Sequence, residues 1–497
     1  MLRFICEPFY THMEISDVTY LPQDMACPID SRYYGANPEF LNRLKPYVSE
    51  EAYVRYQARV EVALAEVLVE QNIAPATFAE ELKSASKKIK VEDVYAEEQR
   101  IGHNIRALVN CLKTYISKTA QPFVHLCATS NDITDTAMAL RLKELTREIL
   151  LPDLIRLENT IITLSRAHAD TIQIGRTHGQ HAIPITFGYA MANYAARVGN
   201  RIHQIENARL NLRGQLSGAV GAYNALSLLV PENTVDFERS VLQKLGLQPV
   251  DTQISTQIVH PEYITDLVHA VTSTFSVLAN IADDIRQLHR SEIGEVHERY
   301  DADRVGSSTM PHKQNPSNFE FVKSMWKAMM PRMMTLYMDQ ISEHQRDLTN
   351  SASARFITEL FTAFIYATNR LTNALDRLEV DKNSMSRQLQ GTEFEAILAE
   401  PLYILLTTQG HPDGYGGAKK VVEQARITGA SVAELMWKDK SLAPYLKNLS
   451  TEQRNLFENP QKYIGAAIQQ THATCNHWET HCQQLTEQLK SESQSLG

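Results

Sequence analysis

Long apolar stripes at helical spacing constrain the fold of this chain more than any other feature. One stripe runs over residues 264–288, with apolar or small side chains alternately three and four positions apart. This is a heptad pattern sustained for more than three repeats. Similar stripes run over 187–205 and 357–378. Helices this long cannot bury their stripes inside a small globule, so they predict a mainly α fold with a long helical bundle that assembles with other subunits.

The length of the chain predicts more than one domain. A chain of 497 residues is expected to form about two to four domains. Turn-forming segments separate the stripes from their flanking regions. We therefore expect an N-terminal helical domain over 1–128, a central long-helix bundle over 129–380 and a C-terminal helical domain over 381–497.

Composition argues against several classes of protein. The net charge of −9 leaves no basic excess to neutralise phosphates, so no nucleic-acid partner is expected. The six cysteines include no CxxC pair, which indicates neither a disulfide framework nor a zinc site. An acidic residue stands at position 7, too early for the apolar region of a secretory signal to form before it. No run of about 18 apolar residues, the length that spans a membrane, occurs in the chain. We expect a cytoplasmic protein without a membrane span.

Reactive side chains are concentrated in residues 306–316, a segment bounded by Gly and Pro and therefore expected to be a loop. It carries hydroxyl groups, the ammonium of Lys313 and the carboxamide of Asn315. A serine acts as a base only if its alkoxide is stabilised by hydrogen-bond donors or a nearby positive charge. The backbone N–H groups of this turn and Lys313 could stabilise Ser307 in that way. The alternative is a polar surface loop held by its prolines.

Two further clusters stand at turns that precede helices. His178 lies in a Gly-flanked turn, where a histidine is often a capping or surface residue. The run 129–132, preceded by His125, comes before a helix expected from about Thr134. Hydroxyl groups at a helix N-terminus can cap the helix or bind a carboxylate, and the local pattern supports both interpretations.

Two arginines, Arg346 and Arg355, stand nine residues apart with Ser351 between them. Such residues are usually solvated charges on a helix. Two guanidinium groups and a hydroxyl in a turn that leads into a helix also match the oxygens of a phosphate. Both interpretations are open at this point.

Residues 306–316 resemble the GSSxMPxKxNP loop of the fumarase/aspartase superfamily, whose members cleave C–N or C–O bonds by β-elimination and release fumarate. The resemblance implies that Ser307 is the base that removes the Cβ proton. It also implies that Lys313 and Asn315 bind the substrate carboxylate as charge grows on the carbanion. Met310 of the same segment is expected at the substrate.

Residues 176–178 resemble the second conserved segment of the superfamily, where the histidine is the general acid or its partner. Glu320 lies thirteen residues beyond Ser307, where the family places a carboxylate that orients this histidine and favours its charged form. His103 resembles a family histidine near the leaving group, although Asn104 follows it where Asp is usual. A lone histidine there is usually structural, so the resemblance leaves open whether His178 or His103 donates the proton.

Other segments resemble the adenylosuccinate lyases within this superfamily. The pattern at 125–130 resembles the segment whose Thr-Ser pair binds the succinyl carboxylate. Residues 346–355 resemble the element that binds the nucleotide phosphate. Residues 31–33 and 255–257 resemble two more segments that contact the substrate. The substrate-binding residues implied are Arg32, Tyr33, His125, Thr129, Ser130, Asp132, Thr177, Gln257, Met310, Asn315, Arg346, Ser351 and Arg355.

The resemblance extends from about residue 32 to residue 465. It implies release of fumarate from adenylosuccinate and from the succinyl-carboxamide ribotide of purine synthesis, without a metal or organic cofactor. It also implies a homotetramer in which one site takes segments from three subunits. Two alternatives are another fumarate-releasing lyase, such as argininosuccinate lyase, and a non-catalytic structural protein on the same scaffold. The phosphate element argues against the first alternative, and the retained catalytic residues argue against the second.

Overall fold

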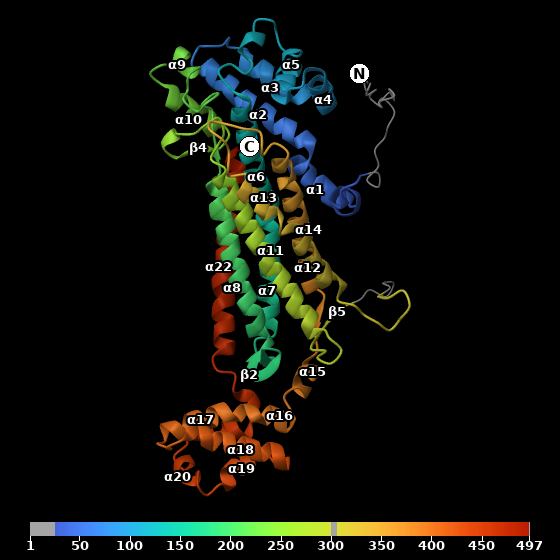
Figure 1. The fold of residues 1–497 in the computed structure, drawn as a ribbon, viewed down its shortest axis with the longest axis vertical. Coiled ribbons are helices and arrows are strands. Elements are labelled where there is room, and N and C mark those ends of the chain that lie inside the picture. Colours follow the sequence, from blue (N-terminus) through green and yellow to red (C-terminus); the bar gives the residue numbers. More distant parts are fainter. Residues whose placement is uncertain (1–24, 300–305, 497) are drawn as a thin grey trace, which may run out of the picture.

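The computed structural model describes residues 25–299 and 306–496. A bundle of long helices forms the middle of the molecule, with a group of shorter helices at each end (Figure 1). Of the described residues, 67% are helical, which confirms the predicted mainly α fold. The expectations drawn from residues 1–7, including the one about a signal sequence, lie outside the described residues.

The central bundle is formed by the helices that carry the apolar stripes. The three predicted stripes correspond to α8 (Phe187–Leu210), α11 (Glu262–Leu288) and α14 (Ile357–Leu375). The third stripe was expected to continue to Leu378, but that residue lies in strand β6 (Leu378–Val380). The other bundle helices are α6 (Ser130–Leu145), the π-helical turn η5 (Thr146–Leu150), α7 (Leu151–Ala167), α12 (Ser317–Met329) and α13 (Arg332–Met338), with the 3₁₀ turn η7 (Ser353–Phe356) before α14.

Helix α11 lies at the centre of this packing. It contacts α8, α12, α13 and α14, and its stripe residues Leu267, Val271 and Leu278 are fully buried. By length and composition it could cross a membrane, but 67% of its most apolar window is buried inside the protein. That degree of burial is typical of a core helix in a bundle.

Helices α6 and α7 join through η5 into one rod. The rod runs without a break from Ser130 to Ala167. At about 1.5 Å per residue, these residues span roughly 55 Å. The rod therefore separates Thr129, just before its start, from the β1–β2 hairpin, just after its end, by the full length of the bundle.

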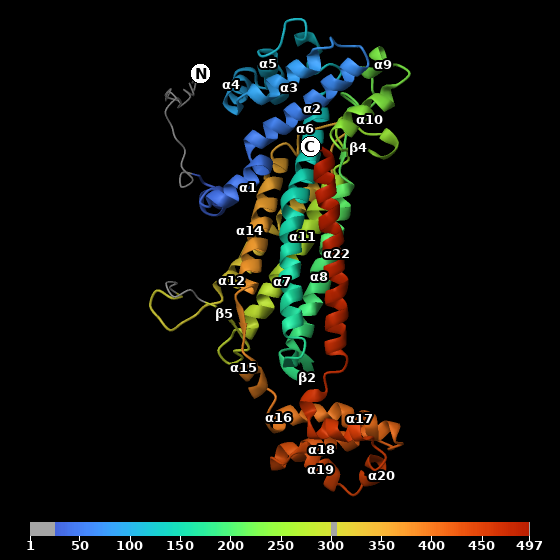
Figure 2. The ribbon, with the colours of Figure 1, turned by 180° about the vertical axis from the view of Figure 1, so that it is seen from behind.

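The last helix, α22 (Ala467–Leu496), returns along the bundle and packs against α7 and α8 (Figure 2). Its buried residues include Cys475, Trp478, Cys482, Leu485 and Leu489. Gly199 of α8 admits the Trp478 ring, because a Cβ atom at this position would lie 2.2 Å from it. These residues fall within the predicted C-terminal domain, yet the helix lies in the bundle. The division of the chain at residues 128 and 380 stays a prediction.

A second group of helices covers the first end of the bundle. They are η3 (Ile29–Tyr34), α1 (Pro38–Val48), α2 (Glu50–Glu70), α3 (Phe78–Lys88), α4 (Val91–Ile101), α5 (Asn104–Lys113), η4 (Gln121–Phe123), α9 (Leu226–Leu229), α10 (Thr234–Lys244) and η6 (Asp251–Gln253). Helix α2 packs against α6, and α10 packs against α2, so these helices are fixed to the start of the rod.

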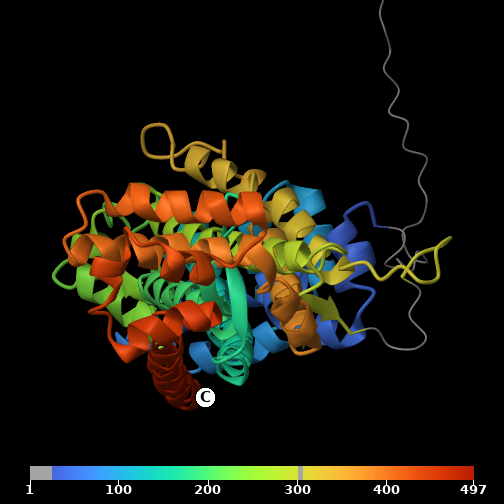
Figure 3. The same cartoon turned by 90° about the horizontal axis from the view of Figure 1, so that it is seen from below.

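The helices at the other end have a core of their own, which contains Phe394, Leu402, Val421 and Phe457. They lie across the end of the bundle when the molecule is viewed from below (Figure 3). They are α15 (Lys382–Arg387), α16 (Gly391–Glu395), η8 (Ala396–Leu398), α17 (Ala399–Thr408), α18 (Gly414–Thr428), α19 (Val432–Lys438), α20 (Ala443–Leu446), α21 (Thr451–Glu458) and η9 (Pro460–Lys462).

The described strands form three two-stranded sheets. In the antiparallel hairpin, β1 (Ile172–Thr177) pairs with β2 (Gln180–Thr186). In the parallel pair, β3 (Arg213–Gly214) lies beside β4 (Gln248–Pro249). In the third sheet, β5 (Val296–Glu298) pairs antiparallel with β6. The hairpin and the third sheet matter for the candidate site.

Candidate active site

His178 lies at the tip of the β1–β2 hairpin, which follows the end of the rod. His178 and Gly179 form a two-residue turn, and both have positive φ, 55° and 75°. This is the pattern of a type I′ turn, whose twist matches that of the flanking strands. Strand β1 is fixed to the rest of the molecule because the fully buried Glu295 accepts hydrogen bonds from Arg176 Nη2 (2.6 Å) and Gln173 Nε2 (2.7 Å). The exposed tip presents Thr177 and His178 to solvent.

The Ser307 loop, residues 306–316, projects from the side of the bundle (Figure 3). Ser307 Oγ accepts hydrogen bonds from the backbone N–H groups of Met310 (3.1 Å) and Thr309 (3.4 Å). Asn315 Nδ2 donates to the carbonyl of Gly306 (2.9 Å) and closes the loop. A Cβ atom at Gly306 would lie 2.4 Å from the Lys313 carbonyl, so the close approach requires glycine. Lys313 and Met310 are exposed.

Glu320 lies in the first turn of α12, just beyond this loop, and is exposed. Asn318 anchors the same turn, because its amide donates to the buried Glu298 of β5 and its Oδ1 accepts from Arg370 Nε (2.8 Å). No hydrogen bond or ion pair joins Glu320 to His178 within the described part of the chain. The expected orientation of His178 by Glu320 is therefore not formed inside one chain.

Thr129 and Asp132 form a capping box at the start of α6. The helix begins at Ser130, not near Thr134 as expected, because the Thr129 side chain caps the N3 backbone N–H and Asp132 accepts from Thr129 N (2.9 Å). Asp132 is fully buried and also accepts from the backbone N–H groups of Ser217 and Gly218. Burial raises the pKa of Asp132 to about 7, against the effect of these donors. Asp132 thus holds Thr129 and Ser130 in place.

His125 pairs with a residue that the sequence did not suggest. Its Nδ1 lies 2.7 Å from Oε1 of Glu61 on α2. Burial of the imidazole disfavours its charged form, but the charge and hydrogen bond of Glu61 outweigh this, so the pKa of His125 is raised. The ring therefore prefers positive charge, and Asp132 in the first turn of α6 is near enough to add to that preference.

The segments around Gln257 and Arg346 lie near the same helix start. Gln257 donates its backbone N–H to the Gln345 carbonyl (3.3 Å), and its own carbonyl accepts from Gln215 Nε2 (2.6 Å). Arg346 donates to Asn350 Oδ1 (2.8 Å), while its buried Nε has no hydrogen-bond partner in the described structure. Ser351 and Arg355 are exposed in the following turn.

The remaining predicted residues lie outside this cluster or have structural contacts. Tyr33 packs against Phe321 and Tyr366, with ring centroids 5.4 and 5.3 Å apart, while Arg32 beside it is exposed. His103 is the N-cap of α5 and accepts a hydrogen bond from Arg106 N at Nδ1 (3.2 Å). Its local role is therefore that of a helix cap, with Nε2 left for other contacts.

The start of α6 and the β1–β2 hairpin lie at opposite ends of the bundle (Figure 1). We call the region around Thr129, Gln257 and Arg346 the Thr129 end, and the region of the hairpin tip the His178 end. The Ser307 loop belongs to neither end, because it projects from the side of the bundle (Figure 1). The rod from Ser130 to Ala167 connects the two ends. A single chain therefore does not bring all of these residues together.

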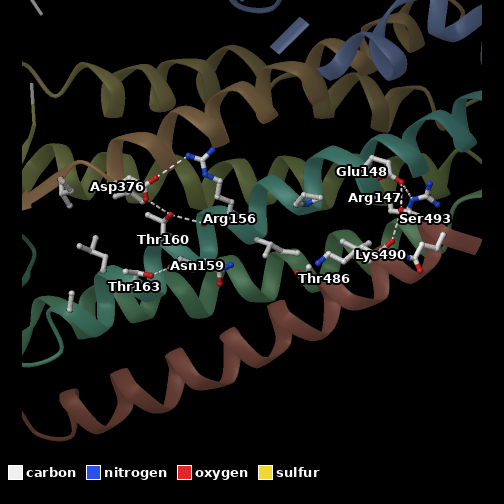
Figure 4. A pocket seen from close by; sticks show the side chains of 18 residues that line it. Arg147, Glu148, Arg156, Asn159, Thr160, Thr163, Asp376, Thr486, Lys490 and Ser493 are labelled. Carbon is white, nitrogen blue, oxygen red and sulfur yellow. Dashed lines mark hydrogen bonds and ion pairs between the residues drawn. The ribbon is translucent and has the colours of Figure 1, made fainter. Parts of the chain in front are cut away.

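A groove of about 1000 Å³ between α7, α14 and α22 contains none of the predicted residues (Figure 4). Its lining arginines already have acidic neighbours: Arg156 lies 3.6 Å from Asp376, and Arg147 lies 2.6 Å from Glu148. Its lining does not match the chemistry of the predicted site, so we place the candidate site at the two bundle ends and the Ser307 loop, and not in this groove. Among the described residues, no group of three or more His, Cys, Asp or Glu side chains is arranged to hold a metal ion.

Comparison with known proteins identifies the family. The model of the family described as Lyase matches residues 31–330, and the one described as Adenylosuccinate lyase C-terminal matches residues 342–464. Adenylosuccinate lyase of Methanocaldococcus jannaschii is 31% identical over 468 residues, covering 92% of this chain and 97% of the relative. That of Pyrococcus abyssi is 31% identical over 446 residues, covering 88% and 95%.

The chain belongs to the adenylosuccinate lyase family. It is a lyase, and the resemblance to the fumarase/aspartase superfamily is confirmed. A crystal structure of fumarate lyase from Mesorhizobium sp. BNC1 has a similar fold, with a TM-score of 0.75 at 21% identity, covering 88% of this chain and 97% of that one.

Sequence reasoning missed the buried acids of this lyase that support the predicted residues. Glu61 pairs with His125, Glu295 holds the hairpin, and Glu298 holds the start of α12. Each of these acids lies on a different segment of the chain from the residue that it supports. The spacing of residues along the sequence therefore did not indicate the contact. The only local signal was an acid within an otherwise apolar stretch, as at Glu61 in α2.

Proposed function

We propose that this lyase releases fumarate from adenylosuccinate, leaving AMP, and from the succinyl-aminoimidazole-carboxamide ribotide of purine nucleotide biosynthesis, leaving its carboxamide. The observation that carries the reaction type is the geometry of Ser307. Two backbone N–H groups already point at its Oγ, and such donors stabilise a serine alkoxide. Family membership supports the choice of substrate.

In the proposed reaction, the Ser307 alkoxide removes the proton from Cβ of the succinyl group, and the electrons remain on a carbanion stabilised by the adjacent carboxylate. Lys313, Asn315, Thr129 and Ser130 bind the succinyl carboxylates, on which negative charge grows. The C–N bond then breaks, fumarate forms, and the departing nitrogen takes a proton from His178, which Glu320 orients. His103 is the alternative donor.

The nucleotide phosphate is bound, in this proposal, by Arg32, Tyr33, Arg346, Ser351 and Arg355. Charge-assisted hydrogen bonds from guanidinium groups are suited to phosphate oxygens. The buried Nε of Arg346, which has no hydrogen-bond partner in the described structure, supports this role. His125, Gln257, Thr177 and Met310 complete the proposed substrate contacts.

We also propose a cytoplasmic homotetramer in which the Thr129, His178 and Ser307 segments of one site come from three subunits. The rod supports this arrangement because it holds Thr129 and His178 roughly 55 Å apart along one chain. Antiparallel packing of two such bundles would place the Thr129 end of one chain beside the His178 end of another. Closed oligomers with symmetry repeat that arrangement at every site.

The substrate is tested by ultraviolet absorbance after the purified protein is mixed with adenylosuccinate and, separately, with argininosuccinate. We expect a change of the purine absorbance that is accompanied by equimolar fumarate, and no fumarate from argininosuccinate. Fumarate from argininosuccinate alone would contradict the nucleotide assignment. A third reaction uses the succinyl-carboxamide ribotide. Release of no fumarate from any of the three compounds would contradict the proposed function as a whole.

A further inference from the structure

The Glu61–His125 pair is built more tightly than a surface ion pair. The Glu61 side chain is fully buried, whereas 18% of the His125 side chain remains accessible. Glu61 Oε1 lies 2.7 Å from His125 Nδ1, and Glu61 Oε2 is buried without any hydrogen-bond partner in the described structure. The other ring nitrogen of His125, Nε2, makes no hydrogen bond within the described residues. The pair therefore has one buried acidic end and one partly open imidazole end.

The backbone around His125 is held in an uncommon conformation. His125 and Cys127 both have positive φ, 66° and 64°, a region that non-glycine residues rarely adopt. Such conformations persist only where the surroundings enforce them, and they are frequent at binding sites. Thr129, the cap of α6, follows only two residues later.

The burial of Glu61 indicates the charge state of the pair. A buried carboxylate whose second oxygen lacks a partner is costly unless an opposite charge lies against it. The charged groups that face His125 are Glu61 on α2, Asp132 on α6 and Arg106 on α5. The two acids favour the imidazolium and Arg106 opposes it, with the net effect of a raised pKa.

We propose that Glu61 is a positioning residue, which donates no group to the substrate but keeps His125 as an imidazolium whose Nε2–H binds an anionic oxygen of the substrate. Because Nδ1–H donates to Glu61, the ring can present only Nε2 to a ligand. The position beside Thr129 and Ser130 assigns a succinyl carboxylate as that anion. This last assignment rests on the proposed function, whereas the charge state of His125 does not.

The charge state is tested by nuclear magnetic resonance of the full-length protein labelled with ¹³Cε1-histidine. The His125 signal is identified as the one missing from His125→Gln. The substitution Glu61→Gln keeps the shape of the side chain but removes its charge. In this variant we expect the titration midpoint of His125 to fall by about one to three pH units. Equal midpoints in the two proteins would overturn the proposal, even if adenylosuccinate proved not to be the substrate.

The binding role is tested by the pH dependence of KM for adenylosuccinate. At pH 6, where an unaided imidazole is largely protonated, KM of Glu61→Gln should lie within about threefold of the parent value. At pH 8 it should be roughly ten- to a hundredfold higher, with a much smaller change in kcat. A KM ratio that does not change with pH would contradict a role through charge.

Two comparisons separate positioning from general damage to the fold. Glu66 lies on the same helix as Glu61, but its Oε2 lies 3.7 Å from Lys244 Nζ. The control variant Glu66→Gln should therefore leave KM unchanged at both pH values. In the His125→Gln background, Glu61→Gln should add no further increase in KM, because Glu61 acts through the imidazole. Additive effects of the two substitutions would overturn the proposal.

Discussion

Thr129 and His178 lie beyond opposite ends of the same helical rod. The rod begins at Ser130 and ends at Ala167, and the β1 strand then leads to His178 at the hairpin tip. Both residues belong to the proposed site, yet the rod is far longer than any nucleotide. The proposed chemistry therefore requires at least two chains.

Ser307→Ala should abolish turnover, because the proposed base is removed while the Asn315–Gly306 contact that closes the loop remains. Steady-state release of fumarate measures this effect, and circular dichroism and light scattering check helicity and assembly. Adenylosuccinate should still bind, since its carboxylate and phosphate contacts remain. Ser308→Ala is the matched control, because Ser308 is the exposed neighbour in the same loop. Near-normal activity of Ser307→Ala would move the role of base to another residue.

Arg346→Ala and Arg355→Ala should each weaken nucleotide binding by about 1.5–3 kcal/mol, the range for a lost charge-assisted hydrogen bond. Calorimetric titration with AMP measures the loss directly. The kcat should fall as well if phosphate binding orients the succinyl group. Arg426→Ala is the control, since this exposed arginine lies on α18, away from the bundle. Unchanged affinity in both variants would indicate that these arginines are solvated surface charges.

The bundle could be predicted where its stripes consist of aliphatic residues. The stripe over 264–288 corresponds closely to α11, and the one that begins at Phe187 corresponds to α8. Helix α22 was missed as part of the bundle although its buried residues Cys475, Trp478, Cys482, Leu485 and Leu489 also alternate three and four apart. This stripe contains cysteine and tryptophan and is surrounded by many Gln, His and Thr residues, so it does not stand out as an apolar pattern. Its burial also depends on the packing of Trp478 against Gly199.

The candidate site could be predicted only where its residues are adjacent in sequence. Residues 306–316 and 129–132 are continuous, so their types and order indicated their chemistry. The Glu61–His125 contact joins residues 64 positions apart, and only the tertiary packing of α2 against α6 creates it. The separation of Thr129 from His178 likewise depends on the length of the rod, which the sequence indicated only in part.

Buried Glu158 on α7 should make the stability of the protein depend on pH. Neither carboxyl oxygen has a hydrogen-bond partner in the described structure, and burial raises the pKa of Glu158 well above its ordinary value. The folded state therefore keeps a proton that the unfolded state releases above about pH 4.5. The contribution of Glu158 to the free energy of unfolding is fully present below that pH and is lost as pH rises through the folded pKa.

Urea unfolding of Glu158→Gln and of the parent protein, at equal concentration from pH 5 to pH 8, tests this prediction. Between about pH 4.5 and the folded pKa of Glu158, the parent should lose up to about 1.4 kcal/mol of unfolding free energy per pH unit relative to the variant. Glu487→Gln, an exposed substitution on α22, should follow the parent. Parallel curves for the parent and Glu158→Gln would mean that Glu158 has the same proton affinity in both states.

The most direct test of the shared site is complementation between Ser307→Ala and His178→Ala. Each protein should be inactive alone, because every site lacks one group. After the two are mixed in equal amounts, dissociated and reassembled, roughly a quarter of the sites should contain both an intact Ser307 and an intact His178, if these come from different subunits of a closed oligomer. Fumarate release should then recover to about that fraction of the parent activity. Complete subunit exchange without recovered activity would show that both residues serve a site within one chain, and it would contradict this account.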